Sequence, residues 1–296
     1  MDKNLIFVIG GDGLFGCTLV PVLKFNKRNV KTVSRTNQAS DYNVDFSDPV
    51  CVNEFLDEHK PATIINLAGL TDVDFCEASP NMSFRANVKV VENIAHWIKD
   101  SQSGCHLIHI STDHVYDGHG SHKENDVTIT NYYAFSKFAG ELAAQLVPST
   151  IYRTNFFGKS FCPKRRSLSD WLFTSLTSGD SIQVFDDVLF NPLSMDTLSE
   201  FILQSIDKKP IGLYNLGSRD GFSKADFAYS FSKVLGLDSK NMRRTTTDKV
   251  NFLKIYRPKI MLMDCSKFET DFKIVLPTLE EEIIKVARKY YETTKF

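Results

Sequence analysis

Short apolar runs alternate with longer mixed stretches through the first half of the chain. The apolar runs are rich in β-branched or large side chains, as is typical of buried strands, and cover residues 5–9, 30–34, 63–67, 106–111 and 150–154. The stretches between them have lengths that suit helices, at about 14–26, 49–59, 80–100 and 131–147. Because parallel strands need long crossover connections, this alternation predicts an α/β fold with a doubly wound parallel sheet.

The rhythm changes after residue 155, where helical patterns follow one another with only brief extended pieces between them. Helices are expected at about 167–178, 195–207, 223–236 and 278–292, and extended pieces at 182–185 and 212–216. Ser223, with Asp226 three residues on, fits the start of a helix, because a serine hydroxyl can accept a free backbone N–H group there. We predict a first domain over 1–155, which also receives later segments, and a smaller mixed α/β lobe over 156–296.

Composition narrows the classes of function. The 296 residues include 35 Lys and Arg against 36 Asp and Glu, a net charge of −1, which offers no broad attraction for nucleic acid or an anionic membrane. Apolar runs stay short of the ~20 residues that a membrane-spanning helix needs. The six cysteines are scattered singly, without the spacing of a zinc site. We expect a cytoplasmic protein that binds neither nucleic acid nor membrane and holds no metal.

A glycine-rich turn follows the first predicted strand. Gly10, Gly13 and Gly16 have G-x-x-G-x-x-G spacing and lead into a helical pattern. In such a turn the first glycine permits the tight bend and the second lets the backbone approach a pyrophosphate, while the third allows close packing of helix and sheet. Glycines also mark plain turns, but the position between a strand and a helix favours a dinucleotide site.

The end of the second strand bears on the choice of dinucleotide. NAD-selective sites commonly place an acidic residue here, on the 2′-hydroxyl of the adenosine ribose. This chain has Ser34 and Arg35 instead, a hydroxyl and a cation that suit a 2′-phosphate. We therefore expect NADPH, with NADH use and a merely solvated Arg35 as the alternatives.

Tyr133 and Lys137 are four residues apart in a helical pattern, which places a phenol and an ammonium side by side on one face. A phenol with the ordinary pKa of about 10 transfers protons poorly at neutral pH, and a neighbouring cation favours the phenolate. Thr112 directly follows the fourth predicted strand, and ligands of open α/β sheets bind at the carboxyl ends of strands. These three side chains are our candidates for the reacting centre.

Together these motifs resemble the extended short-chain dehydrogenase/reductases, and within them the dTDP-4-dehydrorhamnose reductase group of sugar-nucleotide reductases. The likeness runs over nearly the whole chain, because further motifs occur in that family's order. They are Asn66-Leu67-Ala68-Gly69, Asn87, Ser111-Thr112-Asp113, Asn131, Gly140-Glu141, Arg153-Thr154-Asn155, Asn191-Pro192-Leu193 and Arg257-Pro258. The resemblance implies a Rossmann domain for the first part of the chain and a substrate-binding lobe for most of the rest.

The resemblance also implies roles for individual residues. Thr112, Tyr133 and Lys137 would form the catalytic triad, and Thr112 and Asp113 match a substrate-contacting pair. Cofactor contacts would come from Gly13, Leu14 and Phe15 at the pyrophosphate, Asp45 and Phe46 at the adenine, and Ala68, Gly69 and Leu70 at the ribose, with Tyr133 and Lys137. The implied reaction is hydride transfer from NADPH to the C4 ketone of a nucleotide-linked 4-keto-6-deoxysugar, in deoxysugar and cell-surface polysaccharide biosynthesis.

The chain departs from that family where the sugar is concerned. Phe156 stands where a substrate-facing tryptophan is usual, so the apolar surface remains and the indole N–H is lost. The basic run 164–166 has two interpretations, a solvated loop or a clamp on the diphosphate of the substrate. The identity of the sugar therefore stays open.

Two other functions also stay open. Sugar-nucleotide epimerases and dehydratases use the same tyrosine and lysine, with NAD that returns to its starting oxidation state. A regulatory subunit of methionine adenosyltransferase resembles the same reductases, so a non-catalytic NADP-binding protein is an alternative, although the triad here is complete. The sequence does not determine whether the chain forms a homodimer.

Overall fold

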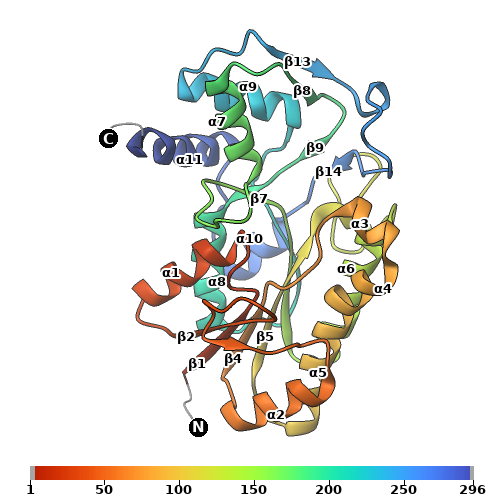
Figure 1. Cartoon of the computed structure of the whole chain (residues 1–296), viewed down its shortest axis with the longest axis vertical. Coiled ribbons are helices and arrows are strands. Elements are labelled where there is room, and N and C mark those ends of the chain that lie inside the picture. The colour runs from red at the N-terminus through yellow and green to blue at the C-terminus, as the bar shows by residue number, and fades with distance from the viewer. Residues whose placement is uncertain (1–3, 294–296) are drawn as a thin grey trace. The chain divides into compact units, whose positions relative to one another are not determined.

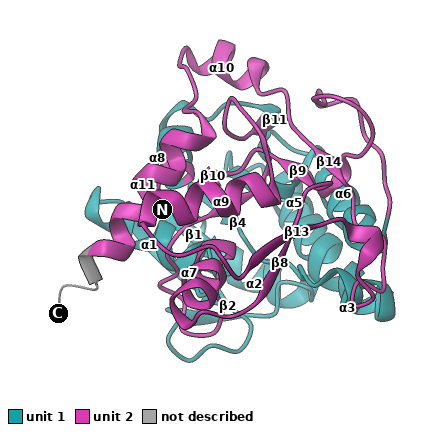
Figure 2. Ribbon diagram, turned by 90° about the horizontal axis from the view of Figure 1, so that it is seen from above, with its two compact units in different colours: residues 1–112, 131–153, 199–214 teal, residues 113–130, 154–198, 215–296 magenta. Residues whose placement is uncertain are grey.

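The computed structural model describes residues 4–293. Residues 1–3 of the first predicted domain and 294–296 of the second lie outside the described residues. The chain divides into two compact units, each made of segments that are distant in sequence (Figure 2). The first unit comprises residues 1–112, 131–153 and 199–214, and the second comprises 113–130, 154–198 and 215–296. The chain therefore passes repeatedly from one unit to the other.

Most of the large sheet belongs to the first unit. Its seven strands have the order β11-β6-β5-β4-β1-β2-β3. The bounds are β1 Leu5–Ile9, β2 Asn29–Ser34, β3 Tyr42–Asn43, β4 Thr63–Asn66, β5 His106–Thr112, β6 Ser149–Thr154 and β11 Gly212–Leu216. β1 pairs in parallel with both β2 and β4, and β4 pairs in parallel with β5. The strand order thus reverses beside β1, where open α/β sheets bind their ligands.

Helices cover both faces of this sheet (Figure 1). On one face lie α2 (Pro49–His59), α5 (Val90–Ser101) and α6 (Tyr132–Ala144), and on the other lie α1 (Gly16–Phe25) and the first-unit part of α8 (Met195–Lys208). An ion pair between Arg28, just after α1, and Asp207 near the end of α8 joins the second pair of helices, at 2.5 Å. With helices on both faces, the predicted doubly wound architecture is confirmed.

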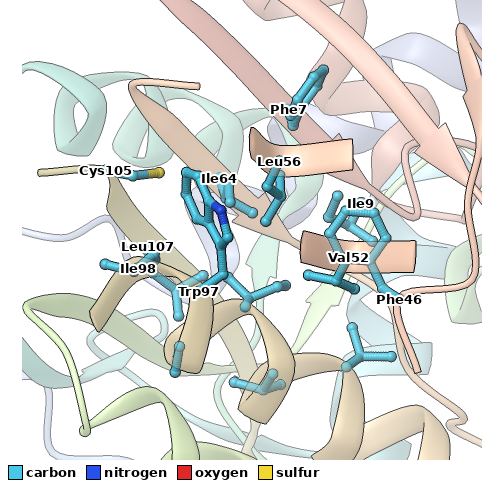
Figure 3. Close-up of a cluster of buried hydrophobic side chains, with 14 of the residues drawn as sticks. Phe7, Ile9, Phe46, Val52, Leu56, Ile64, Trp97, Ile98, Cys105 and Leu107 are labelled. Carbon is cyan, nitrogen blue, oxygen red and sulfur yellow. The ribbon is translucent and has the colours of Figure 1, made fainter. Parts of the chain in front are cut away.

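The core under α2, α5 and α6 shows why the strands read as continuous apolar runs (Figure 3). Phe7 and Ile9 of β1 point to this face, and Val8 between them is fully buried toward the other. Trp97 of α5 packs in the same cluster and donates its indole N–H to Asp57 of α2 at 2.9 Å. A strand that is buried on both sides needs apolar side chains at successive positions.

One predicted helix is interrupted. The stretch expected at 80–100 consists of α4 (Pro80–Phe84), a π-helical turn at Arg85–Lys89, and α5. A short helix not foreseen from the sequence, α3 (Val73–Ala78), precedes it, and the Asp72 carboxylate caps that helix by accepting the N–H of Phe75 at 3.0 Å. π-turns within helices occur often at functional sites, which directs attention to Arg85–Lys89.

The second unit combines helices with small sheets. Its helices are α7 Leu168–Ser178, α9 Lys224–Leu235, α10 Ser266–Phe272 and α11 Leu279–Thr293. Its strands are β7 Phe156–Phe157 with β10 Leu193–Ser194, β9 Leu189–Phe190 with β12 Phe222–Ser223 and β14 Ile260–Met261, and β8 Ile182–Phe185 with β13 Met242–Thr245. As predicted, the Ser223 hydroxyl caps a helix, accepting the N–H of Asp226 at 2.9 Å. None of the described helices combines the length and apolarity needed to cross a bilayer.

Candidate active site

The glycine-rich turn joins β1 to α1 in the first unit. Gly10 has a φ of +76°, and a Cβ built there would lie 2.9 Å from the backbone nitrogen of Ala68, so a side chain would collide with the segment after β4. A Cβ at Gly16 would lie 2.5 Å from the Gly11 oxygen, which keeps the start of α1 against the turn. At Gly13 it would meet, among the described residues, only the Gly10 oxygen, at 3.2 Å. The turn thus leaves space beside Gly13, just before α1, where a pyrophosphate could be held.

The two residues between Gly13 and Gly16 lie in different surroundings. Phe15 is buried, and its carbonyl accepts the N–H groups of Thr18 and Leu19. Leu14 is only partly buried. Any contact of these residues with the pyrophosphate would therefore come from the backbone of Phe15 and from the more open surface of Leu14.

The three candidates for the reacting centre are buried in the first unit. Thr112 is the last residue of β5, and Tyr133 and Lys137 lie in α6; their exposed fractions are 4%, 7% and 5%. The Asn131 side chain caps α6 by accepting the N–H of Ala134 at 2.9 Å, so the helix begins one residue before Tyr133. The Lys137 ammonium donates to the Ile110 carbonyl oxygen at 2.7 Å, which ties α6 to the end of β5.

Lys137 also lies beside the segment after β4. A Cβ built at Gly69 would be 3.8 Å from the Lys137 Nζ atom, so this ammonium is close to Ala68-Gly69-Leu70. Burial lowers the pKa of Lys137 from its ordinary value to about 8, although the Glu141 carboxylate opposes that shift. An ammonium that titrates near neutral pH can influence a neighbouring phenol in the working range of an enzyme.

Asn87 and Ser136 connect the segment after β4 to the catalytic helix. Asn87 lies in the π-turn, is 1% exposed, and accepts the Leu70 N–H at 2.7 Å while donating to the Leu70 carbonyl oxygen at 3.0 Å. Its amide also donates to the Ser136 hydroxyl at 2.8 Å, one residue before Lys137. The sequence predicts no role for Asn87 and gives no sign of Ser136; an asparagine in line with the apolar positions of a helical pattern is the signal for such a buried link.

The adenosine end of the expected cofactor site is built from loops. The Ser34 hydroxyl accepts the N–H of Asn37 at 2.8 Å and the amide of Asn43 at 3.3 Å, so it shapes its own loop. Arg35 is exposed. The Asp45 carboxylate accepts a hydrogen bond from the Ser47 hydroxyl at 2.7 Å. Burial tends to raise the pKa of Asp45, but the hydrogen bonds from Ser47 and the charges of Arg35 and Arg85 lower it overall.

The ring of Phe46 belongs to the core rather than to this surface. It is 3% exposed and packs edge-on against Phe55, with the ring centroids 6.0 Å apart (Figure 3). Its carbonyl oxygen accepts the Asn93 amide at 3.0 Å. Of the pair Asp45 and Phe46, Asp45 therefore presents a side chain at the surface, and Phe46 fixes the loop that carries it.

Two candidate substrate residues lie in the second unit. Asp113 is 1% exposed, and its carboxylate accepts the Asn155 amide at 2.7 Å. Burial lowers the pKa of Lys224, while the Asp113 charge opposes that shift, so these two groups are near one another. Phe156 is partly buried in β7, and the basic run 164–166 is exposed. Within this unit, a buried carboxylate with polar partners thus accompanies a partly open aromatic ring.

The histidines in and after β5 serve separate local contacts. His106 bonds Thr150 at 2.8 Å and His109 bonds Asn66 at 3.1 Å in the first unit, while His122 stacks on Tyr116 in the second, with ring centroids 5.2 Å apart. Over residues 4–291, whose side chains are described, no three His, Cys, Asp or Glu side chains form a group that could hold a metal ion.

Comparisons with known proteins bear on this geometry. A family model described as the RmlD substrate binding domain matches residues 4–292. The probable low-salt glycan biosynthesis reductase Agl14 of Haloferax volcanii is 27% identical over 288 residues, 94% of this chain and 95% of that protein. The dTDP-4-dehydrorhamnose reductase of Shigella flexneri is 27% identical over 270 residues, 86% of this chain and 89% of that protein.

A solved structure has the same fold. The dTDP-4-dehydrorhamnose reductase of Bacillus anthracis, in complex with NADP, matches with a TM-score of 0.87 and 21% identity, and covers 97% of this chain and 99% of that chain. This likeness confirms the predicted α/β fold class. Both relatives match most of this chain, and both are named as reductases. This confirms the expected enzyme class, an oxidoreductase of the short-chain dehydrogenase/reductase type. Since the family model matches all but the ends of the chain, the protein belongs to the RmlD substrate binding domain family, as its motifs had indicated.

Proposed function

We propose that the protein reduces the C4 ketone of a nucleotide-linked 4-keto-6-deoxysugar with NADPH. The observation that carries this proposal is the burial of Thr112, Tyr133 and Lys137 in one unit, with Lys137 next to Gly69 and bonded to the end of β5. A phenol, a hydroxyl and an ammonium in that arrangement suit protonation of an oxygen that is gaining negative charge.

In this proposal the three side chains divide the work. When bound, NADPH supplies the hydride for the ketone carbon. Thr112 donates a hydrogen bond to the ketone oxygen, and Tyr133 gives it a proton as negative charge develops there. Lys137 binds the nicotinamide ribose and, as an ammonium, favours loss of the Tyr133 proton. Because its pKa is about 8, Lys137 remains charged at neutral pH and loses its charge above that value.

The two units have different proposed tasks. The first holds the dinucleotide through Gly10, Gly13 and Gly16, which leave room for a pyrophosphate at the start of α1. The second supplies sugar contacts from Asp113 and Phe156. NADPH is favoured because residues 35–40, which follow β2, include the cation of Arg35 and no acidic residue, and NADP in the Bacillus anthracis neighbour supports this choice.

An NADPH oxidation assay tests this function. The wild-type protein is mixed with NADPH and a panel of nucleotide-linked 4-keto-6-deoxysugars, beginning with dTDP-4-dehydrorhamnose, the class of substrate named for the Shigella flexneri relative. We expect loss of nicotinamide absorbance with at least one sugar and a slower rate with NADH. Conversion of a sugar without net NADPH oxidation would instead indicate an epimerase or dehydratase, and cofactor binding without conversion would indicate a regulatory protein.

A further inference from the structure

A buried ion pair lies in the first unit, next to the catalytic helix. Glu141 and Arg153 are 0% and 1% exposed, and the Nη2 atom of Arg153 is 2.6 Å from the Oε2 atom of Glu141. The Nε atom of the same guanidinium donates to both carboxylate oxygens, at 3.0 and 3.1 Å. Removing two charges from water costs several kcal/mol per ion, and well-packed apolar residues often replace such pairs without loss of stability. Stability alone therefore does not account for this pair.

The Glu141 carboxylate has a second partner that leads to the reacting centre. Its Oε1 atom accepts the hydroxyl of Ser111, the residue immediately before Thr112 in β5. One turn earlier in α6, Lys137 donates to the carbonyl oxygen of Ile110. Two charged side chains of one helix thus hold two successive residues of β5, and the next residue is Thr112. A displacement of about 1 Å in such a constellation can cost on the order of a hundredfold in rate.

Glu141 also places its charge near Lys137. The two residues are four apart in α6, which brings them to the same face, and the carboxylate opposes the effect of burial on the Lys137 ammonium. On β5, His109 is buried with a pKa well below its ordinary value, because of burial and the Lys137 charge, and is therefore neutral. On β6, Arg153 contributes the opposing positive charge.

The helices packed against α6 bring few other charges to this place. On α3, Glu77 accepts the backbone N–H of Tyr132 at 2.9 Å. In the π-turn, Arg85 donates to Ser47 and Lys89 pairs with Glu92 of α5 at 2.6 Å. The remaining ionisable residues of α5 are exposed, and α4 has none. Glu141 is thus the charged group of α6 that acts on the Lys137 ammonium, and Arg153 of β6 is its partner.

We propose that Glu141 is a positioning residue of the reductase: paired with Arg153, it fixes Ser111, beside Thr112, against the helix that carries Tyr133 and Lys137, and it places a negative charge on the helix face where Lys137 lies. This inference rests on the proposed function, because it assigns Glu141 a task in that reaction. It makes two separate demands. The charge of Glu141 must affect Lys137, and its hydrogen bond to Ser111 must affect turnover.

The effect of the Glu141 charge on Lys137 is tested by measuring NADPH binding without any sugar. Fluorescence titrations of the wild-type protein between about pH 6 and about pH 10 should show binding that weakens several-fold as Lys137 loses its charge, and Lys137→Met should lack that pH step. Glu141→Gln should move the midpoint down by about one unit, because a neighbouring anion is lost. Arg153→Met should move it up, because the Glu141 charge would no longer be compensated by its guanidinium partner. Loss of packing alone would not give opposite signs.

The control is Glu282→Gln in the second unit. That carboxylate is also buried, at 2% exposed, and accepts the Thr197 hydroxyl at 2.8 Å. The substitution should lower the temperature of unfolding and leave the midpoint where it is. If Glu141→Gln and Arg153→Met bind NADPH with the wild-type midpoint, or shift it in the same direction, the proposal is overturned.

The effect of the Ser111 hydrogen bond on turnover is tested with Ser111→Ala. This variant keeps both buried charges, so it can be measured even if the charge variants do not fold. We expect kcat for NADPH oxidation to fall about tenfold, with the NADPH midpoint unchanged. An unchanged kcat would overturn the positioning role. A wild-type protein that binds NADPH with the pH step and oxidises none with any keto sugar would refute the proposed substrate, while the binding titrations would still decide the charge relation.

Discussion

The two ends of the candidate cofactor site in the first unit are built in different ways. At the reaction end, Tyr133 and Lys137 are less than a tenth exposed and lie on a helix tied to β5 by buried hydrogen bonds. At the adenosine end, Arg35 is exposed, and the Ser34 hydroxyl is hydrogen-bonded within its own loop. Proton transfer needs a fixed geometry, whereas a loop cation can adapt to its ligand. Changes at the first end should therefore have the larger effects.

The largest effect is expected from Tyr133→Phe. Loss of the phenolic proton should reduce NADPH oxidation by about a hundredfold or more, since general acid catalysis has that magnitude, while NADPH binding changes less than about twofold. Initial rates and fluorescence titrations measure the two quantities. Tyr132→Phe, a partly buried neighbour on the same helix, is the control and should keep its activity. Near wild-type turnover in Tyr133→Phe would contradict the mechanism.

Lys137→Met should weaken both turnover and NADPH binding, because the ammonium has two tasks in the proposal. We expect kcat to fall about a hundredfold and the NADPH dissociation constant to rise about tenfold. The wild-type rate should also decline as the pH rises through about 8, since the ammonium is the working form and is lost above its pKa. If the rate of the Lys137→Met variant declines in the same way at alkaline pH, the decline comes from another group.

Asn87→Ala tests the link between the segment after β4 and the catalytic helix. The Leu70 N–H and carbonyl oxygen would lose a buried partner, which should destabilise the protein by about 2–4 kcal/mol and weaken NADPH binding. Chemical denaturation and cofactor titration measure these effects. Asn81→Ala, at an exposed position of α4, should change stability by less than about 0.5 kcal/mol. Equal effects of the two substitutions would show that Asn87 is not a link.

The smallest effects should come from the adenosine end. Arg35→Ala should weaken NADPH binding about tenfold and leave NADH binding unchanged, because only NADPH carries the 2′-phosphate. Ser34→Ala should change NADPH binding less than about threefold, since that hydroxyl already bonds Asn37 and Asn43. Titrations with both dinucleotides test this contrast. A larger loss of NADPH affinity in Ser34→Ala than in Arg35→Ala would reverse this assignment.

The same contrast separates what could be read from the sequence from what could not. The helix that carries Tyr133 and Lys137 and the strand that ends at Thr112 were predictable, because helical spacing and apolar runs are local signals. The glycine spacing at Gly10–Gly16 was equally informative. The burial of Phe46 in the core was not foreseen, since which side of a loop faces the core depends on helices far along the chain.

The pairing of buried polar side chains was the part of the structure that the sequence predicted least. Glu141 and Arg153 appeared in separate motifs, 12 positions apart, and nothing local required that they pair. Asn87 reaches Leu70, 17 positions away.

Local residue patterns were thus sufficient for the main strands and helices of the parallel sheet, the glycine turn and three candidates for the chemistry. Folding in three dimensions settled which polar groups share the interior with those candidates. The physical reason is that a buried polar group needs a partner wherever burial places it, and burial is set by packing between distant segments.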